Sequence, residues 1–183
     1  MKVLKTKFTD VKIFKLKLYS DVRGKFYEFF NQKNYSRYPE IKKSFIQSNI
    51  AISKKNVLRG IHYQNQSPQS QLVTIIEGKI FYVIVDVRRT SKTFLKSETF
   101  ILSSNKINQI FTPPGFACGY LVKSEKSILC YNVSKIYNNR TENGLKWNDK
   151  KLNIKWPKQK YIINKRDSEY KEIKYKLSNE FPK

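Results

Sequence analysis

The feature that most constrains this chain is the alternation of apolar and polar residues over short segments. Phe14, Leu16 and Leu18 alternate with two lysines and a tyrosine. Successive side chains of a β-strand point to opposite faces of a sheet, so this period of two predicts a strand with one buried face. Further strands are predicted in KFYEFFNQ, FIQSNIAIS, NVLRGIHYQ, TFILSS, INQIFTPPGFACGYLV and KSILCYNVSKIY, each bounded by polar, Gly or Pro residues. The chain is therefore expected to be all-β.

The run QLVTIIEGKIFYVIVDVR is predicted to be a hairpin of two buried strands that turns at its Glu-Gly step. Many short strands separated by turns are typical of an antiparallel double-sheet jelly roll. From about Asn138 the alternation weakens and two tryptophans occur, which indicates a segment that covers the sheets. In the tail, Tyr170, Ile173 and Leu177 would form one stripe of a short C-terminal helix.

The length of 183 residues suits one domain, residues 1–183, that buries roughly 70% of the surface of its unfolded chain. Aromatic residues make up 14% of the sequence, which supplies bulky side chains for a core without disulfides. The cysteines, Cys118 and Cys130, lie in unrelated contexts, as expected in a reducing compartment. No stretch resembles a signal peptide or approaches the ~20 apolar residues that span a bilayer. We expect a cytoplasmic protein with no membrane partner.

The chain is strongly basic, with 37 Lys and Arg against 14 Asp and Glu and a formal charge of +23. Basic residues neutralise phosphates in non-specific nucleic-acid binding, so a nucleic-acid binder is one hypothesis. The lysines, however, alternate with apolar residues or lie in turns, and no RNA-binding signature or zinc-finger spacing accompanies them. We therefore expect no nucleic-acid partner. The same positive field also suits a small phosphorylated substrate.

His62, in NVLRGIHYQ, is the only histidine of the sequence. Metal sites in cupin-like jelly rolls need several imidazoles, so no metal is expected. Arg59 and His62 would lie on opposite faces of a regular strand, but Gly60 permits a β-bulge that turns both toward one cavity. An imidazole titrates near neutral pH, so His62 is a candidate acid or base. A lone histidine is more often structural, and the assignment therefore depends on its neighbours.

Segments of this chain also resemble a known family. They are DVRGKFYE, FIQSN, KKNVLRGIHYQ, QLVTIIEGKIFYVIVDVR, FTPPGFACGYLV, ILCYNVSKIY and LKWNDKKLNIKWP. In this order they are similar to segments of the dTDP-4-dehydrorhamnose 3,5-epimerase family. Each segment alone is a weak indication, but their shared order is specific. The resemblance covers about residues 15–167 and implies a jelly roll that dimerises, in agreement with the strand pattern.

The resemblance implies a catalytic role for three residues. His62 matches the general base that removes a proton from the sugar carbon next to the 4-keto group. Asp167, in NKRDS, matches the carboxylate that holds the far ring nitrogen of this base, which fixes its tautomer and raises its basicity. Tyr131, in LCYN, matches the acid that returns a proton on the opposite face. Without the resemblance, Tyr131 would be interpreted as a core tyrosine in a strand.

A larger set matches positions that hold the nucleotide diphosphate and the sugar in the family: Arg23, Glu28, Gln47, Asn49, Arg59, Tyr137 and Glu142. An arginine fork suits a pyrophosphate because it binds two oxygens at once. Arg166 stands where the family often has lysine and is also expected to contact the substrate. Without the resemblance, most of these polar side chains would be assigned to a solvated strand face.

Two expected substrate contacts depart from the family pattern. Gln71, in SQLV, replaces a lysine thought to steady the enolate oxygen, and Cys118, in PPGFACGY, replaces a second active-site histidine. A neutral amide can donate a hydrogen bond to developing negative charge, but charge-assisted bonds are about twice as strong. The resemblance thus supports proton abstraction next to a ketone more firmly than inversion at both C3 and C5.

The leading hypothesis is an isomerase that epimerises a nucleotide-linked 4-keto-6-deoxy sugar, with dTDP-4-dehydro-6-deoxyglucose as the first candidate. No redox cofactor is expected because the oxidation state does not change, and the family resemblance implies a homodimer. Besides nucleic-acid binding, two alternatives stay open. One is epimerisation at C3 alone, on this or another nucleotide sugar. The other is a nucleotide-sugar-binding protein that has lost turnover.

Overall fold

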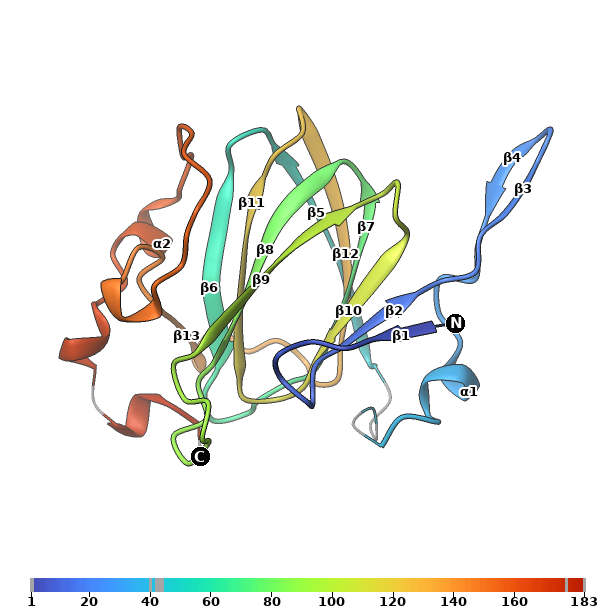
Figure 1. The fold of residues 1–183 in the computed structure, drawn as a ribbon. Helices are drawn as coiled ribbons and strands as arrows, with labels where there is room; N and C mark the ends of the chain where they lie inside the picture. The colour runs from blue at the N-terminus through green and yellow to red at the C-terminus, as the bar shows by residue number, and fades with distance from the viewer. Residues whose placement is uncertain (1, 40, 42–44, 177, 183) are drawn as a thin grey trace.

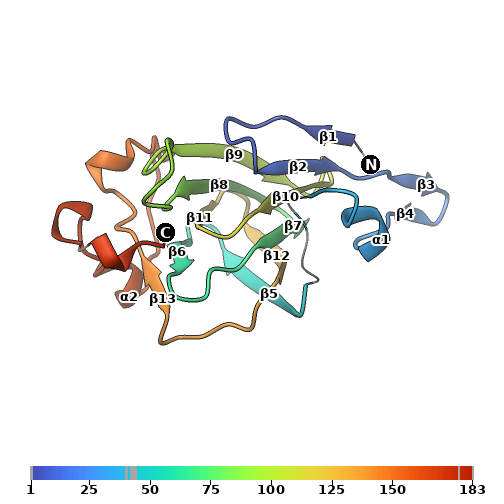
Figure 2. The same cartoon turned by 90° about the horizontal axis from the view of Figure 1, so that it is seen from below.

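The structure is a computed structural model, and it describes residues 2–39, 41, 45–176 and 178–182. Two antiparallel sheets pack against each other (Figures 1 and 2). The six-stranded sheet has the order β1 (Lys2–Leu4), β2 (Lys12–Lys15), β10 (Asn108–Thr112), β7 (Gln71–Glu77), β12 (Lys126–Val133) and β5 (Gln47–Lys54). The five-stranded sheet has the order β13 (Glu142–Gly144), β6 (Leu58–Gln64), β11 (Phe116–Val122), β8 (Lys79–Asp86) and β9 (Ser97–Ser103).

The chain passes from one sheet to the other at most turns, for example from β10 to β11 at the Pro-Pro-Gly corner, and this confirms the predicted jelly roll. The predicted hairpin of β7 and β8 is wrong. β7 pairs with β10 and β12, whereas β8 pairs with β11 and β9. Only Gly78, with φ +88°, separates the two strands. A tight hairpin needs about two turn residues, so this single glycine instead turns the chain from one sheet into the other.

Three apolar clusters form the layers of the fold. The central cluster lies between the sheets and includes Val73 and Leu129 from one sheet and Ile84 from the other. The outer face of the six-stranded sheet is covered by the segment around α1 (Gln32–Tyr35), where Tyr35 packs with Phe14. The chain after β13 covers the outer face of the five-stranded sheet, as predicted for the tryptophan-containing segment (Figure 1).

The C-terminal segment consists of short turns of helix. They are η1 (Lys150–Leu152), α2 (Lys165–Ser168), η2 (Ile173–Tyr175) and η3 (Ser178–Glu180). The predicted amphipathic helix of the tail is replaced by the two 3₁₀ turns η2 and η3. Ile173 is buried as predicted and Tyr170 packs on His62, but Leu177 lies outside the described residues. No helix in the described ranges is long and apolar enough to cross a membrane.

A small hairpin of β3 (Tyr19–Asp21) and β4 (Gly24–Phe26) extends away from both sheets (Figure 1). Its turn is formed by DVRG, with Gly24 at φ +126°. The rings of Tyr19 and Phe26 lie 6.3 Å apart on the hairpin, and Phe26 is 70% exposed. Leu18, which precedes the hairpin, is also exposed, so the burial predicted from the alternation ends at Leu16.

Candidate active site

A cavity of about 320 Å³ lies between the two sheets. Its walls contain all of the predicted site residues except Arg23, Glu28 and Asp167. The residues that line it are Gln47, Asn49, Arg59, His62, Gln71, Cys118, Tyr131, Tyr137, Glu142 and Arg166, together with others that the sequence did not single out. The inward-facing positions of β5, β6, β7, β11 and β12 thus converge on one space.

The β-bulge that Gly60 permits is present. On β6 and β11, His62 pairs with Cys118 and Arg59 pairs with Tyr120, so one extra residue is accommodated on β6. Gly60 has φ +106°, and a Cβ placed there would lie 2.7 Å from the carbonyl oxygen of Cys118. A side chain is therefore excluded at this position, and the bulge turns both Arg59 and His62 into the cavity.

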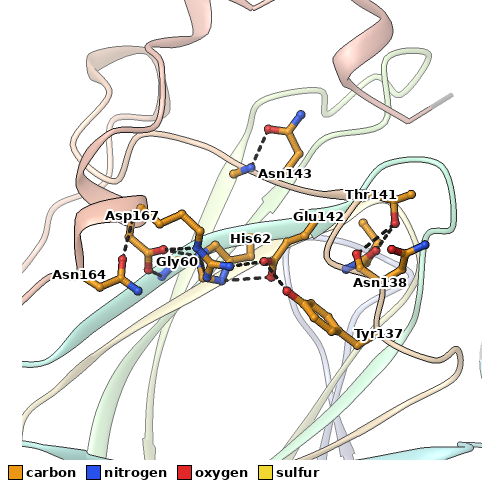
Figure 3. Close-up of polar contacts among 12 residues, drawn as sticks. Gly60, His62, Tyr137, Asn138, Thr141, Glu142, Asn143, Asn164 and Asp167 are labelled. Atoms are coloured by element: carbon orange, nitrogen blue, oxygen red, sulfur yellow. Dashed lines mark hydrogen bonds and ion pairs between the residues drawn. The ribbon is translucent and has the colours of Figure 1, made fainter.

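The His62 ring is held from behind by Asp167 (Figure 3). The Nε2 atom of His62 lies 2.8 Å from Oδ1 of Asp167, and the backbone N–H of Gly60 donates to Oδ2 at 2.8 Å. Asp167 comes from α2, where Asn164 caps the first turn by accepting a hydrogen bond from the Asp167 N–H at 2.7 Å. The bulge thus both directs His62 into the cavity and fixes the carboxylate behind it.

The protonation of this pair follows from its surroundings. Burial alone raises the pKa of Asp167, but the hydrogen bond and charge of His62 and the Gly60 N–H outweigh it and bring this pKa below the usual value. The carboxylate is therefore ionised at neutral pH and can only accept a hydrogen bond. It follows that Nε2 of His62 carries the hydrogen, and that Nδ1 is the nitrogen available as a base.

Tyr131 reaches the cavity from β12, in the sheet opposite to that of His62. Burial raises the pKa of Tyr131, and the nearby Tyr120 raises it further, while Arg59 lowers it in part. The phenol therefore stays protonated at neutral pH and can donate a proton. The imidazole of His62 in one sheet and the phenol of Tyr131 in the other thus face the cavity from two sides.

Glu142 connects several polar residues beside His62 (Figure 3). Its carboxylate accepts hydrogen bonds from Tyr137 Oη, at 2.9 Å, and from Arg166, and its Oε1 lies 3.9 Å from Nδ1 of His62. The backbone N–H of Tyr137 in turn donates to Oε1 of Gln47 at 2.9 Å, and Gln47 Nε2 donates to Asn49 at 2.9 Å. These contacts hold a row of donors and acceptors along one side of the cavity.

Arg59 is held by a pair of hydroxyls that the sequence analysis missed. Its Nε donates to Oγ of Ser53 at 3.2 Å, and Ser53 Oγ lies 3.2 Å from the hydroxyl of Tyr120. Tyr120 lines the cavity and shares the strand β11 with Cys118. The two residues are an even number of positions apart, so strand alternation would have found Tyr120 once Cys118 was assigned to the cavity.

The other residues that the sequence analysis did not assign to the site were harder to recognise from the sequence. Gln69 precedes β7, Tyr82 lies in the continuous apolar run of β8, and Tyr170 lies in the tail. Tyr170 packs edge-on against the His62 ring, with centroids 5.8 Å apart. No metal-binding group of three His, Cys, Asp or Glu side chains occurs among the residues that the structure describes.

Arg23 and Glu28 do not reach the cavity of their own chain. Arg23 sits on the projecting β3–β4 hairpin and pairs with Asp21 through a 3.1 Å contact. Glu28 follows the hairpin and accepts hydrogen bonds from the side chains of Asn31, at 2.9 Å, and Asn34, at 2.7 Å. The predicted binding residues are therefore found in two separate places.

The fold and the site define the class of protein: a jelly roll with a histidine–carboxylate pair facing a tyrosine across a polar cavity. The sequence profile of the dTDP-4-dehydrorhamnose 3,5-epimerase family matches residues 5–175. The chain belongs to this family, whose members are isomerases.

Individual relatives are similar to this chain over most of its length. A dTDP-4-dehydrorhamnose 3,5-epimerase from Shigella flexneri is 40% identical over 168 residues, which cover 91% of this chain and 93% of the relative. A dTDP-6-deoxy-D-glucose-3,5-epimerase from Legionella pneumophila, solved in complex with dTDP-4-keto-L-rhamnose, has a TM-score of 0.96 and 34% identity, covering 99% of this chain and 97% of its own. An epimerase from Bacillus anthracis, solved with TDP and pyrophosphate bound, has a TM-score of 0.89 and 34% identity. The match covers 94% of this chain and 99% of the Bacillus chain.

Proposed function

We propose that this protein epimerises a dTDP-linked 4-keto-6-deoxy sugar, with dTDP-4-dehydro-6-deoxyglucose as substrate. The observation that carries the proposal is the His62–Asp167 pair and Tyr131 on opposite walls of one cavity. The sugar nucleotide named for the Legionella structure supports the substrate class. The proposal extends the family membership to a specific reaction of this chain.

In the proposed mechanism, Nδ1 of His62 removes the proton from a carbon next to the ketone. Asp167 then stabilises the imidazolium through Nε2, because its carboxylate is ionised and lies 2.8 Å away. Tyr131 returns a proton to the same carbon from the other side, which inverts the centre. The oxidation state of the sugar does not change, so the chemistry needs only an acid and a base.

Binding of the substrate is assigned to the polar residues of the cavity walls. Arg59 is suited to the diphosphate because its guanidinium is oriented by Ser53. Gln47, Asn49, Tyr137 and Glu142 already form one hydrogen-bonded row, so they offer a prearranged set of donors and acceptors for the nucleoside and the sugar. Arg166, paired with Glu142, is assigned to the same row.

We further propose that the protein works as a homodimer in which each β3–β4 hairpin completes the cavity of the partner. An isolated two-stranded hairpin is at best marginally stable in water, and this one exposes Tyr19 and Phe26. The edge strand β5 exposes Ile50 and Ile52, at 68% and 64%, on the face away from the cavity. We propose that these apolar surfaces contact each other between protomers and that Arg23 of the hairpin reaches the second cavity around the edge strand β5. We place the dimer in the cytoplasm, where its two thiols remain free.

The test is to incubate the protein with dTDP-4-dehydro-6-deoxyglucose in deuterated water and to follow the C3 and C5 protons by NMR. Exchange at both carbons would establish 3,5-epimerisation. Gln71 and Cys118, which replace the family's lysine and histidine, favour one second candidate, inversion at C3 alone, and this would appear as exchange at C3 only. A folded protein that binds dTDP but exchanges neither proton would contradict the proposal for this substrate.

A further inference from the structure

Cys118 is the direct cross-strand neighbour of His62. The two residues pair in register on the antiparallel strands β11 and β6, and both line the cavity. Residues paired in this way point to the same face of the sheet, with Cβ atoms about 4.5–5.5 Å apart. The thiol is therefore the side chain next to the proposed base, where it can reach an atom bonded to the carbon that His62 deprotonates.

Two buried hydroxyls stand beside this thiol. Tyr82 and Thr112 are only 2% and 1% exposed, and within the described ranges neither hydroxyl has a well-aligned hydrogen bond. Both nevertheless lie in reach of Cys118: burial raises the pKa of its thiol to about 11, and hydrogen bonding with Tyr82 and Thr112 opposes this rise only in part. Buried hydroxyls usually have a hydrogen-bonding partner, and the neighbour that these two share is the Cys118 thiol.

Four described side chains without charge meet here, with Gln71 and Thr112 in the six-stranded sheet and Tyr82 and Cys118 in the five-stranded sheet. Gln71 pairs in register with Thr112 on the neighbouring strands β7 and β10, and Gln71, Tyr82 and Cys118 all line the cavity. Burial also raises the pKa of Tyr82 well above its usual value, so phenol and thiol both stay protonated at neutral pH. We call Gln71, Tyr82, Thr112 and Cys118 the neutral cluster. It offers N–H, O–H and S–H donors to an oxygen of the ligand.

We propose that Cys118 is a catalytic residue that donates an S–H hydrogen bond to the ketone oxygen while His62 removes the adjacent proton. Tyr82 and Thr112 are positioning residues that orient the thiol, and Gln71 supplies a second donor. This inference rests on the proposed function. The C–H bond breaks, its electron pair forms the C=C bond of the enolate, the carbonyl π electrons move to the oxygen, and the proton goes to Nδ1. The S–H bond stays intact, and reprotonation at carbon restores the ketone.

The test compares Cys118→Ala and Cys118→Ser by the rate of solvent proton exchange into the sugar and by the affinity for dTDP. We expect Cys118→Ala to lower kcat about tenfold or more with little change in dTDP affinity, because a hydrogen bond to an oxyanion is lost only in the transition state. Cys118→Ser keeps a donor and should retain most of the activity. Cys130→Ala is the matched control, since Cys130 pairs with the outward-facing Ile50 and should have no effect.

A second pair of variants tests the positioning role and guards against a Cys118 variant that does not fold. Thr112→Val should lower kcat several-fold at unchanged dTDP affinity, and Thr112→Ser, which keeps the hydroxyl, should restore it. Wild-type kcat in folded Cys118→Ala and Thr112→Val would overturn this inference and leave the proposed function intact. An unaltered protein that exchanges no proton in any nucleotide-linked keto sugar would instead overturn both.

Discussion

Nε2 of His62 and Oδ1 of Asp167 lie 2.8 Å apart although 105 positions separate the two residues in the chain. The second oxygen of Asp167 is occupied by the N–H of Gly60, so the carboxylate is fixed at both ends. A carboxylate held in this way sets the tautomer of the histidine and stabilises its charged form, and both effects matter for a base.

Replacing Asp167 by Asn should therefore lower kcat by about a hundredfold or more, within the range that general base catalysis contributes. The affinity for dTDP, measured by calorimetry, should stay within about twofold because Asp167 lies behind the His62 ring. Asp149→Asn is the matched control: Asp149 is also a buried acid, but it accepts from the N–H groups of Lys151 and Ile173. It should affect the melting temperature and leave kcat unchanged. Equal loss of activity in both variants would argue against the assigned role.

The bulge on β6 makes a prediction about Gly60. In Gly60→Ala the new methyl group would meet the Cys118 carbonyl at 2.7 Å, in addition to the strain of φ +106°. Gly24→Ala is a control with a similar φ of +126° but nothing within 4 Å of the new carbon. We expect Gly24→Ala to cost about 1–3 kcal/mol of unfolding free energy. Gly60→Ala should cost more and should also abolish exchange, because Arg59 and His62 would no longer face one cavity. Urea denaturation measures the first effect and NMR the second.

The proposed dimer makes a prediction about mixed protomers. At substrate concentrations below KM, the Arg23→Ala and His62→Asn homodimers should each lose most of their activity, the first because diphosphate binding is weakened by about 1.5–3 kcal/mol and the second because the base is removed. A mixed dimer of the two variants should contain one complete site, built from the His62 of one protomer and the Arg23 of the other. When the two variants are co-expressed with different tags and pair at random, about half of the dimers are mixed and each has one complete site of two. About a quarter of all sites should therefore be complete.

A control sets the limits of this complementation. Mixing His62→Asn with Asp167→Asn should restore nothing, because both residues belong to the same cavity. If the mixture of Arg23→Ala and His62→Asn also stays inactive while capture through both tags recovers mixed dimers and light scattering gives the mass of a dimer, the hairpin does not serve the partner's cavity. Ile50→Lys combined with Ile52→Lys should yield monomers in the same measurement, because two charges would be placed on the proposed contact surface.

Asp86 makes a prediction about the pH dependence of stability. Burial alone raises the pKa of Asp86, but hydrogen bonds from Arg88, Ser91 and Thr93 outweigh it and lower this pKa below the usual value. Because the pKa of Asp86 is lower in the folded than in the unfolded chain, its carboxylate stabilises the fold at pH values above the unfolded pKa of about 4. This stabilisation is lost as the pH falls through the pKa of Asp86 in the folded protein. Arg88→Met should therefore cost about 3 kcal/mol at pH 7, or roughly 10 °C in melting temperature.

The cost of Arg88→Met should shrink toward pH 4, because the uncompensated Asp86 then takes up a proton. Met keeps an apolar stem against Phe116, whose ring centroid lies 4.5 Å from the guanidinium, so the loss of packing is limited. Lys55→Met is the control, since Lys55 and Glu125 form an exposed pair at 2.5 Å. An exposed pair contributes at most about 1 kcal/mol, and its removal should leave the melting temperature nearly unchanged. A penalty for Arg88→Met that is independent of pH would contradict this account of Asp86.

The sequence by itself determined the local features of this protein. Strand alternation predicted most of the strands, and the glycine of LRGIH marked the position where a bulge could turn Arg59 and His62 to one side. These features depend on side-chain direction and backbone freedom, which are properties of a residue and its immediate neighbours. The family resemblance added the candidate residues on distant segments, such as Asp167, which alternation cannot connect to His62.

Only the tertiary structure decided how these segments meet. It placed β7 and β8 in different sheets, it brought Tyr82 and Thr112 to Cys118, and it left Arg23 on a hairpin outside the cavity of its own chain. Periodicity tells which face of a strand is buried but not which strand lies beside it. The partners of a strand are selected by the packing of all the apolar faces at once, and the active-site cavity exists only where those faces leave polar residues opposite one another.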